Sequence, residues 1–232
     1  MKYTYTKKIV AHRGDHENFR ENSMAAFRHA AAAGALFAEC DIQFTRDFVA
    51  VVVHDDDLRR LFNVPLHLSQ LDWLELQTRC ELPLLSELLT WLEETPALTC
   101  FIEIKPDIRQ RLSSNDIASR LAQQIPAALV SRIVLISQSG DILDACHERL
   151  ACAIGWVMEE DQRPACRFDY IFMPYSEAHS LEVWQQQGVK VGLYTVNDAA
   201  LARQLIQQGA ELIETDHFSR MLTELEQRYG ND

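Results

Sequence analysis

The sequence predicts a closed barrel of eight parallel β-strands with α-helices between them. Apolar runs of strand length alternate with helical patterns along the chain, and 232 residues is within the size range of such barrels. An open, doubly wound α/β sheet is the alternative, but no glycine-rich loop follows the first strand, so a dinucleotide-binding fingerprint is missing. No linker, low-complexity tract or repeat interrupts the chain, and we expect one domain over residues 1–232.

Nine apolar runs have the length of β-strands. They cover residues 8–12, 36–42, 49–54, 98–105, 132–137, 152–158, 169–175, 190–196 and 211–215. Only residues 43–48 separate the second run from the third, whereas a parallel crossover requires about a dozen residues or more. These two strands should therefore form an antiparallel hairpin, and removing the extra strand leaves eight βα units.

Helical periodicity fills the gaps between these strands. The predicted helices cover residues 23–35, 82–95, 114–126, 140–150, 178–188, 197–209 and 217–229. Several begin at Ser, Asn or Asp and end at Gly, which are the usual caps. The apolar spacing of Leu222, Leu225 and Tyr229 in the last helix is ordinary for packing on a barrel, so it does not predict an oligomeric state.

Composition excludes several classes of protein. The net charge of −12 disfavours a nucleic-acid partner and suits a protein that concentrates cations. The six cysteines form no C-x-x-C pair, so we expect buried thiols at Cys40 and Cys100 and no disulfide framework. The chain has no stretch of about 18 apolar residues, so we expect no membrane span. The N-terminal segment does not resemble a secretory signal, which leads us to expect a cytoplasmic protein.

Charged and titratable side chains gather where four of the predicted strands end, the place where barrels carry their functional groups. The four strand ends read His12-Arg13, Glu39-x-Asp41, His54-Asp55 and Glu103-x-Lys105. Residues two apart on a strand point to one face, so Glu39 with Asp41, and Glu103 with Lys105, should project into the barrel together. We expect these groups to converge on one mouth.

Three buried carboxylates in one place would repel each other, and a bound divalent cation would remove that cost. Oxygen ligands without cysteine favour a hard ion, Mg²⁺ or Ca²⁺. The alternative is a set of internal ion pairs between these acids and Arg13 or Lys105.

Histidines and cations near the carboxylates indicate phosphoryl chemistry. His12 and His54 suit a general acid and base because imidazole titrates near neutral pH. Arg13 and Lys105 suit an anion held beside the metal, so the set favours cleavage of a phosphodiester. We expect the other histidines to lie in loops or on the surface: His16, His29, His67, His147, His179 and His217.

The order of these motifs resembles the glycerophosphodiester phosphodiesterase family. The matching segments are "AHRG" (11–14), "ENS" (21–23), "AF" (26–27), "GA" (34–35), "ECDIQFTRD" (39–47), "VVHDDDLRR" (52–60), "PLLSELL" (83–89), "EIKP" (103–106), "YTVND" (194–198) and "ETD" (214–216). They are collinear with the family and cover nearly the whole chain. The first half carries the more specific motifs.

The resemblance implies a (β/α)₈ barrel that hydrolyses glycerophosphodiesters, its small-molecule substrates, to sn-glycerol 3-phosphate and an alcohol. By this resemblance Glu39, Asp41 and Glu103 are ligands of one divalent cation, and His12 and His54 are the base and acid pair. Arg13 and Lys105 are phosphate contacts. Glu21 and Asn22 match the family's Glu-Asn pair, and we expect Glu21 at the edge of the site, orienting Arg13 or a metal-bound water.

The chain also departs from the family's pattern. Tyr194 replaces a tryptophan and can still stack on a glycerol face, and Arg20 replaces a proline before Glu-Asn. The insertion between Arg60 and Pro83 is short, which favours an open site. Two alternatives follow: a phosphodiesterase of the same barrel type that cleaves lysophospholipids, and a non-catalytic protein that binds glycerophosphoryl ligands. The nucleophile can be water or the glycerol 2-hydroxyl, which would give a cyclic phosphate.

Overall fold

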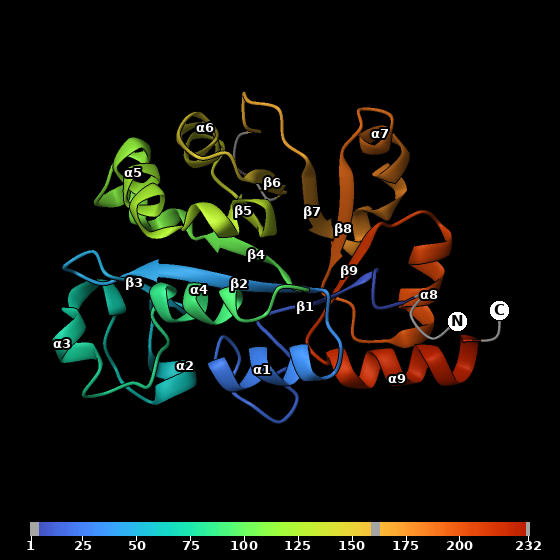
Figure 1. Cartoon of the computed structure of the whole chain (residues 1–232), viewed down its shortest axis with the longest axis horizontal. Helices are drawn as coiled ribbons and strands as arrows, with labels where there is room; N and C mark the ends of the chain where they lie inside the picture. Colours follow the sequence, from blue (N-terminus) through green and yellow to red (C-terminus); the bar gives the residue numbers. More distant parts are fainter. Residues whose placement is uncertain (1–4, 159–162, 231–232) are drawn as a thin grey trace.

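A computed structural model describes residues 5–158 and 163–230 and shows the predicted barrel (Figure 1). Eight parallel strands form the ring: β1 (Ile9–Ala11), β2 (Phe37–Phe44), β4 (Thr99–Ile104), β5 (Ile133–Ser137), β6 (Ala153–Val157), β7 (Tyr170–Pro174), β8 (Lys190–Tyr194) and β9 (Leu212–Thr215). The ring closes because β1 pairs in parallel with both β2 and β9. This closure excludes the open doubly wound sheet.

The ninth strand lies outside the ring. β3 (Ala50–Val52) pairs antiparallel with residues 42–44 of β2, so the predicted hairpin is confirmed. The expected end of the second strand is wrong, however: β2 runs on to Phe44, because the antiparallel partner satisfies its backbone beyond Asp41. The third strand is correspondingly shorter than expected, and His54 lies in the loop after it.

Helices surround the ring, with α5 (Ser114–Gln124), α6 (Gly140–Arg149) and α7 (Leu181–Gln185) along the upper edge of Figure 1. Along the lower edge lie α1 (Met24–Ala32) and α9 (Phe218–Tyr229), and α9 packs against β1. The remaining helices are α2 (Arg59–Phe62), α3 (Trp73–Leu76), α4 (Leu85–Glu93) and α8 (Ala199–Gln207). Short 3₁₀ segments cover residues 68–70, 106–110, 127–132 and 175–180. The last segment includes residues 178–180, which were expected to begin the α-helix over residues 178–188. No helix among the described residues is long and apolar enough to cross a membrane.

The barrel interior changes from apolar to charged along the strands. Val10, Phe101, Ile136, Phe172 and Leu212 belong to one buried cluster inside the ring. Because side chains alternate along a strand, the next inward positions after Phe101 and Leu212 are occupied by Glu103 and Glu214. The charged mouth of the barrel therefore rests on a packed apolar floor.

The tight turn after β1 depends on Gly14. Its φ is +82°, and a Cβ there would lie 2.8 Å from two atoms of Ala26, one of them in the backbone of α1. We expect Gly14→Ala to destabilise the protein by about 2–4 kcal/mol, from the left-handed backbone together with the clash. Gly34 is the matched control, because its φ is +92° but no atom lies within 4 Å of the added Cβ. Denaturant unfolding should show a clearly smaller loss for Gly34→Ala, and equal losses would contradict the packing argument.

Candidate active site

Three buried carboxylates meet at the mouth of the barrel. Glu39 and Asp41 project from β2 and Glu103 from β4, and the residues are 2%, 1% and 8% exposed. Asp41 and Glu103 are direct partners in the parallel ladder, which places them side by side. One oxygen from each of the three carboxylates lies within 4.8 Å of the others. The E-x-D spacing and the strand register together assemble this cluster.

Two cations contact the same carboxylates. Nζ of Lys105 lies 2.7 Å from an oxygen of Asp41 and 2.7 Å from an oxygen of Glu103. Nε of Arg13 lies 3.1 Å from Asp41, and the Arg13 backbone N–H donates to Glu39 at 3.0 Å. The internal ion pairs considered from the sequence are therefore present. Both cations also line the cavity described below.

The carboxyl groups of the cluster differ in the direction in which their pKa values are shifted. Burial, followed by repulsion from Asp41, raises the pKa of Glu39 well above its ordinary value, and burial also raises the pKa of Glu103. Burial opposes ionisation of Asp41 as well, but Lys105 and Arg13 outweigh it and hold the pKa of Asp41 well below its ordinary value. Asp41 is thus the carboxylate that the two cations neutralise, whereas Glu39 has less compensation.

Glu214 is a fourth carboxylate that the sequence analysis did not single out. It projects inward from β9, is 4% exposed, and has one buried oxygen without a hydrogen-bond partner. Burial, followed by repulsion from Glu103 and Asp41, raises its pKa well above the ordinary value. Its inward position could have been predicted from the sequence, because Glu214 lies two residues after Leu212 at the end of a predicted strand.

We expect Glu214→Gln to stabilise the protein at pH 8 when no cation is present. Folding raises the pKa of Glu214, so native stability falls as the pH rises from the ordinary pKa of 4.5 toward the raised value. The substitution should recover about 1.4 kcal/mol for each unit of that rise. Thermal melting with a chelator at pH 5 and pH 8 measures the difference, with Glu93→Gln on an exposed position of α4 as the control. A gain at pH 5 as large as that at pH 8 would contradict this ionisation argument.

These acids fit a divalent cation. Among the described residues, Glu39 and Glu214 each keep a buried carboxylate oxygen without a hydrogen-bond partner, although such oxygens are costly to leave unpaired. The donors are all oxygens, which hard ions prefer. Glu39, Asp41 and Glu103 are close enough to share one ion.

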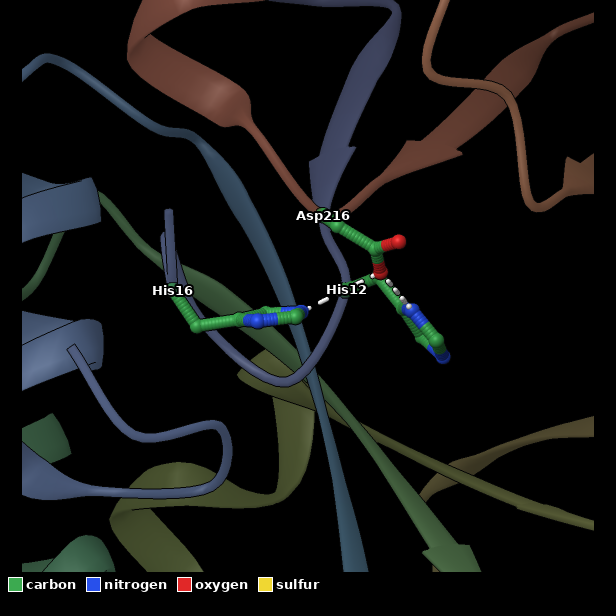
Figure 2. Close-up of side chains that lie close together, drawn as sticks. All are labelled: His12, His16 and Asp216. Atoms are coloured by element: carbon green, nitrogen blue, oxygen red, sulfur yellow. Dashed lines mark hydrogen bonds and ion pairs between the residues drawn. The ribbon is translucent and has the colours of Figure 1, made fainter. Parts of the chain in front are cut away.

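His12 and His54 both approach a carboxylate through Nδ1. Nδ1 of His12 lies 2.7 Å from Asp216 (Figure 2), and its Nε2 lies 3.9 Å from Glu39. Nδ1 of His54 lies 2.6 Å from its neighbour Asp55. A carboxylate on Nδ1 fixes the orientation of the ring and leaves Nε2 for a substrate. Neither aspartate was assigned a role from the sequence.

Burial and hydrogen bonding shift the pKa values of His12 and Asp216 in opposite directions. Burial lowers the pKa of His12 below its ordinary value, although the hydrogen bond to Asp216 acts in the other direction. Burial opposes ionisation of Asp216, but hydrogen bonds from His12 and His16 hold the pKa of this carboxyl well below its ordinary value. Asp216 is therefore a carboxylate at neutral pH, and His12 is largely uncharged.

Asn22 and Glu21 connect the loop after β1 to the site. The Asn22 amide donates to Asp41 at 2.8 Å, and its carbonyl oxygen accepts the Asp41 backbone N–H at 3.2 Å. Glu21 accepts from Arg13 at 3.0 Å and from two nitrogens of Arg60 at 2.7 Å. Arg13 and Asn22 both adopt left-handed backbone, with φ of 55° and 54°, a conformation that is often found at functional sites.

A cavity of about 220 Å³ brings most of the predicted site residues together. Its charged and titratable lining consists of His12, Arg13, Glu39, His54, Glu103, Lys105 and Glu214. The apolar part of the wall includes Ile136, Val157, Phe172 and Tyr194. Asp41, Glu21 and Asn22 do not line the cavity, but Asp41 contacts Lys105, Glu21 contacts Arg13, and the Asn22 backbone N–H donates to the Arg13 carbonyl at 2.9 Å. Tyr194 donates its hydroxyl to the Met158 carbonyl at 3.2 Å.

His16 was expected to lie in a loop or on the surface. It does lie in the loop between β1 and α1, but its Nε2 is 3.1 Å from the oxygen of Asp216 that His12 also contacts. This contact joins His16 to the candidate site, a connection that the sequence pattern did not predict. The connection depends on Asp216, which lies 200 residues further along the chain.

Comparison with known proteins gives the family. Residues 12–220 match the sequence profile of the glycerophosphoryl diester phosphodiesterase family. A glycerophosphodiester phosphodiesterase of Bacillus altitudinis is 31% identical over 142 residues, which cover 56% of this chain and 57% of that protein.

Solved structures of low sequence identity share the fold. A glycerophosphodiester phosphodiesterase from Parabacteroides distasonis is 23% identical, covers 95% of this chain and 97% of its own, and has a TM-score of 0.78. An Oleispira antarctica phosphodiesterase, solved in complex with the product sn-glycerol-3-phosphate, is 20% identical with a TM-score of 0.81. That match covers 97% of this chain and 99% of the other. The chain therefore belongs to the glycerophosphoryl diester phosphodiesterase family, and it is an enzyme of that family.

Proposed function

We propose that this protein hydrolyses glycerophosphodiesters to sn-glycerol 3-phosphate and an alcohol, with the help of one divalent cation. The observation that carries the proposal is the convergence of three buried carboxylates and two aspartate-bound imidazoles at one cavity. The Oleispira enzyme of the same fold binds sn-glycerol-3-phosphate, which supports the substrate class. We also propose that residues 1–232 form one domain, which the contact of α9 with β1 supports.

Glu39, Asp41 and Glu103 would hold the cation, either Mg²⁺ or Ca²⁺. When bound, the ion would stabilise the negative charge that develops on the phosphoryl oxygens. Asn22 fixes the Asp41 carboxylate from two sides, so its role in this proposal is to position a ligand.

Arg13 and Lys105 would bind the phosphate. Each has more N–H donors than its carboxylate partners occupy, since a guanidinium has five and an ammonium has three. Nε of Arg13 is only ion-paired with Asp41 and makes no hydrogen bond, one terminal nitrogen donates to Glu21, and both cations line the cavity. In this role Glu21 holds the Arg13 fork in place, which assigns it to orientation of a phosphate ligand.

His12 and His54 would transfer the protons. One imidazole takes the proton from the attacking hydroxyl group, and the other donates a proton to the departing alkoxide. Both rings reach the cavity through positions that Asp216 and Asp55 fix, so Nε2 of each ring can act on the substrate. Burial lowers the pKa of His12, which favours the uncharged ring that can accept a proton.

The size of the cavity favours small diesters. Its volume of about 220 Å³ is below the range of about 300–1,000 Å³ that is usual for drug-sized ligands. Tyr194 and Phe172 on the apolar wall would contact the glycerol carbons. The acyl chain of a lysophospholipid would have to extend outside this cavity.

The test is release of glycerol 3-phosphate from glycerophosphocholine and glycerophosphoethanolamine, with Mg²⁺, with Ca²⁺ and with a chelator. We expect release that depends on the cation, and slower cleavage of lysophosphatidylcholine. Cleavage of lysophosphatidylcholine alone would support the lysophospholipid reading. No release from any of these diesters, with the cation shown by calorimetry to be bound, would support a non-catalytic binding protein instead.

A further inference from the structure

Asp216 lies between two imidazoles that come from different parts of the chain (Figure 2). One oxygen of Asp216 is 2.7 Å from Nδ1 of His12 and 3.1 Å from Nε2 of His16. His12 follows β1, His16 lies in the next loop, and Asp216 follows β9. The acid–base chemistry proposed above requires His12 and gives His16 no task.

The spacing of these three groups resembles a transition-metal site. Tetrahedral zinc with bonds of ~2.0–2.1 Å places its ligand atoms ~3.3 Å apart. Two separations here are 2.7 and 3.1 Å, and one ligand atom from each residue lies within 4.8 Å of the other two. Small movements of the side chains would therefore create room for an ion in place of the two hydrogen bonds. The side chains of His12, His16 and Asp216 are 14%, 18% and 24% exposed, so an ion can reach them from solvent.

The surroundings of the trio also suit a metal. The second oxygen of Asp216 accepts from the Asn197 amide at 2.7 Å, and such outer contacts orient metal ligands. The His217 ring lies 6.4 Å from the His16 ring, and its Nδ1 is buried without a hydrogen-bond partner. A third imidazole with an unused nitrogen thus lies near His16.

We propose that His12, His16 and Asp216 form a second cation site, which binds Zn²⁺ or a similar borderline transition metal. Two nitrogens and one oxygen select for such ions, whereas the all-oxygen cluster of Glu39, Asp41 and Glu103 selects for a hard ion. A fourth coordination position is left for water. A second consequence, which rests on the function proposed above, is that zinc inhibits the enzyme: with zinc on Nδ1, the His12 ring carries its proton on Nε2 and cannot accept another there.

The first test is direct binding. Zinc chloride is titrated into the protein by calorimetry, with excess Mg²⁺ present to occupy the acidic cluster. The variant is His16→Gln, because a glutamine amide can still donate to Asp216 but is a poor zinc ligand. We expect the affinity for Zn²⁺ to fall on the order of 100-fold, since even outer-shell substitutions cost 10–100-fold. His147→Gln, on α6, is the matched control and should bind zinc as the natural protein does.

Zinc-edge X-ray absorption locates the ion independently of affinity. The natural protein should show two imidazole ligands, and His16→Gln should show fewer. Equal affinity in the two proteins, or a spectrum with oxygen ligands only, would overturn the proposal. Thermal melting confirms that His16→Gln is folded.

An activity assay separates this inference from the proposed function. His16→Gln should hydrolyse glycerophosphocholine at about the natural rate with Mg²⁺, but should require on the order of 100-fold more Zn²⁺ for half-inhibition. Equal inhibition of the two proteins by zinc would refute the inhibitory role. If neither protein cleaves glycerophosphodiesters, the proposed function fails, whereas the binding and absorption results still decide whether the zinc site exists.

Discussion

His12→Ala and His54→Ala should each lower kcat for glycerophosphocholine hydrolysis about 10²–10⁴-fold. The expectation rests on two imidazoles at one cavity, each with Nδ1 held by an aspartate at 2.6–2.7 Å. If one ring is the base and the other the acid, both proton transfers are needed in each turnover, so neither ring can replace the other. Steady-state kinetics with saturating cation and substrate measures the loss.

The double variant sharpens this result. If the two histidines act as a unit, the loss in the double variant should be much smaller than the product of the two single losses. His147→Ala on α6 is the control for removal of an imidazole far from the site, and it should retain natural turnover. Near-normal turnover of His54→Ala would remove His54 from the mechanism, and multiplicative losses would show that the rings act separately.

Asp41→Asn should abolish the stabilisation of the protein by Mg²⁺ or Ca²⁺. An ion at 100 times its Kd adds about 2.7 kcal/mol to the free energy of unfolding, or roughly 5–10 °C in Tm for a chain of this length. Asp41 is buried and faces Glu103 across the strand ladder, so the charge of its carboxylate is central to the proposed cation site. We also expect hydrolysis to fall at least ~10²-fold, since a catalytic cation contributes several kcal/mol.

Thermal melting with and without the cation measures the first effect, and calorimetry measures cation binding itself. Asp41→Asn also removes one carboxylate partner of Lys105 and of Arg13, so its baseline Tm can differ, and the comparison is the shift caused by the cation. Glu93→Gln, exposed on α4, should keep the full shift. An unchanged shift in Asp41→Asn would show that the ion binds elsewhere.

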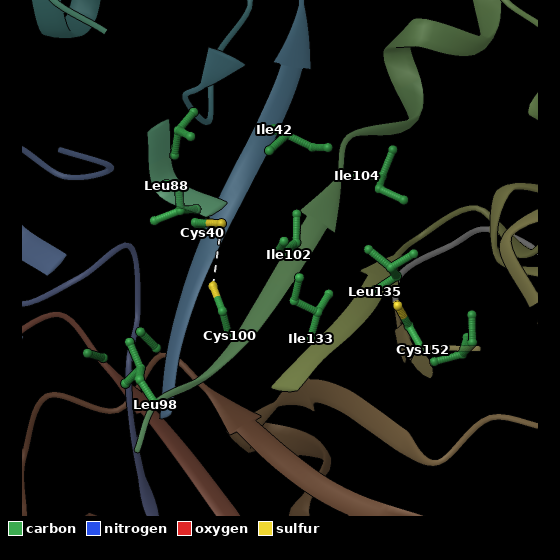
Figure 3. Close-up of a cluster of buried hydrophobic side chains, with 14 of the residues drawn as sticks. Cys40, Ile42, Leu88, Leu98, Cys100, Ile102, Ile104, Ile133, Leu135 and Cys152 are labelled. Atoms are coloured by element: carbon green, nitrogen blue, oxygen red, sulfur yellow. Dashed lines mark hydrogen bonds between the residues drawn. The ribbon is translucent and has the colours of Figure 1, made fainter. Parts of the chain in front are cut away.

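Much of the fold could be predicted because its signals are local. Each predicted strand overlaps one strand of the structure, and the predicted and observed ends differ by at most two residues. The short link after residue 42 already required a hairpin. Cys40 and Cys100 were expected to be buried thiols, and they lie on neighbouring strands within the apolar cluster, with sulfurs 3.9 Å apart and no disulfide (Figure 3). Alternation along β2 and β4 likewise placed Glu39, Asp41 and Glu103 on the inner face.

Other features of the site depend on residues distant in sequence. Asp216 meets His12 and His16 only because ring closure puts β9 beside β1. Arg60 reaches Glu21 across 39 residues, and Asn22 reaches Asp41 across 19. No periodicity or spacing in the sequence reports such contacts, because they arise from loops whose course depends on packing.

The sequence by itself determined the strands, the helices other than α2 and α3, the inward direction of the carboxylates and the types of residue at each strand end. These follow from backbone geometry, which is the same wherever a strand forms. Only the tertiary structure decided which carboxylate each imidazole contacts, that Glu214 joins the acids, and that the two cations pair with Asp41. The physical reason is that hydrogen bonds and ion pairs depend on distances below about 4 Å between side chains, and closure of the barrel sets those distances.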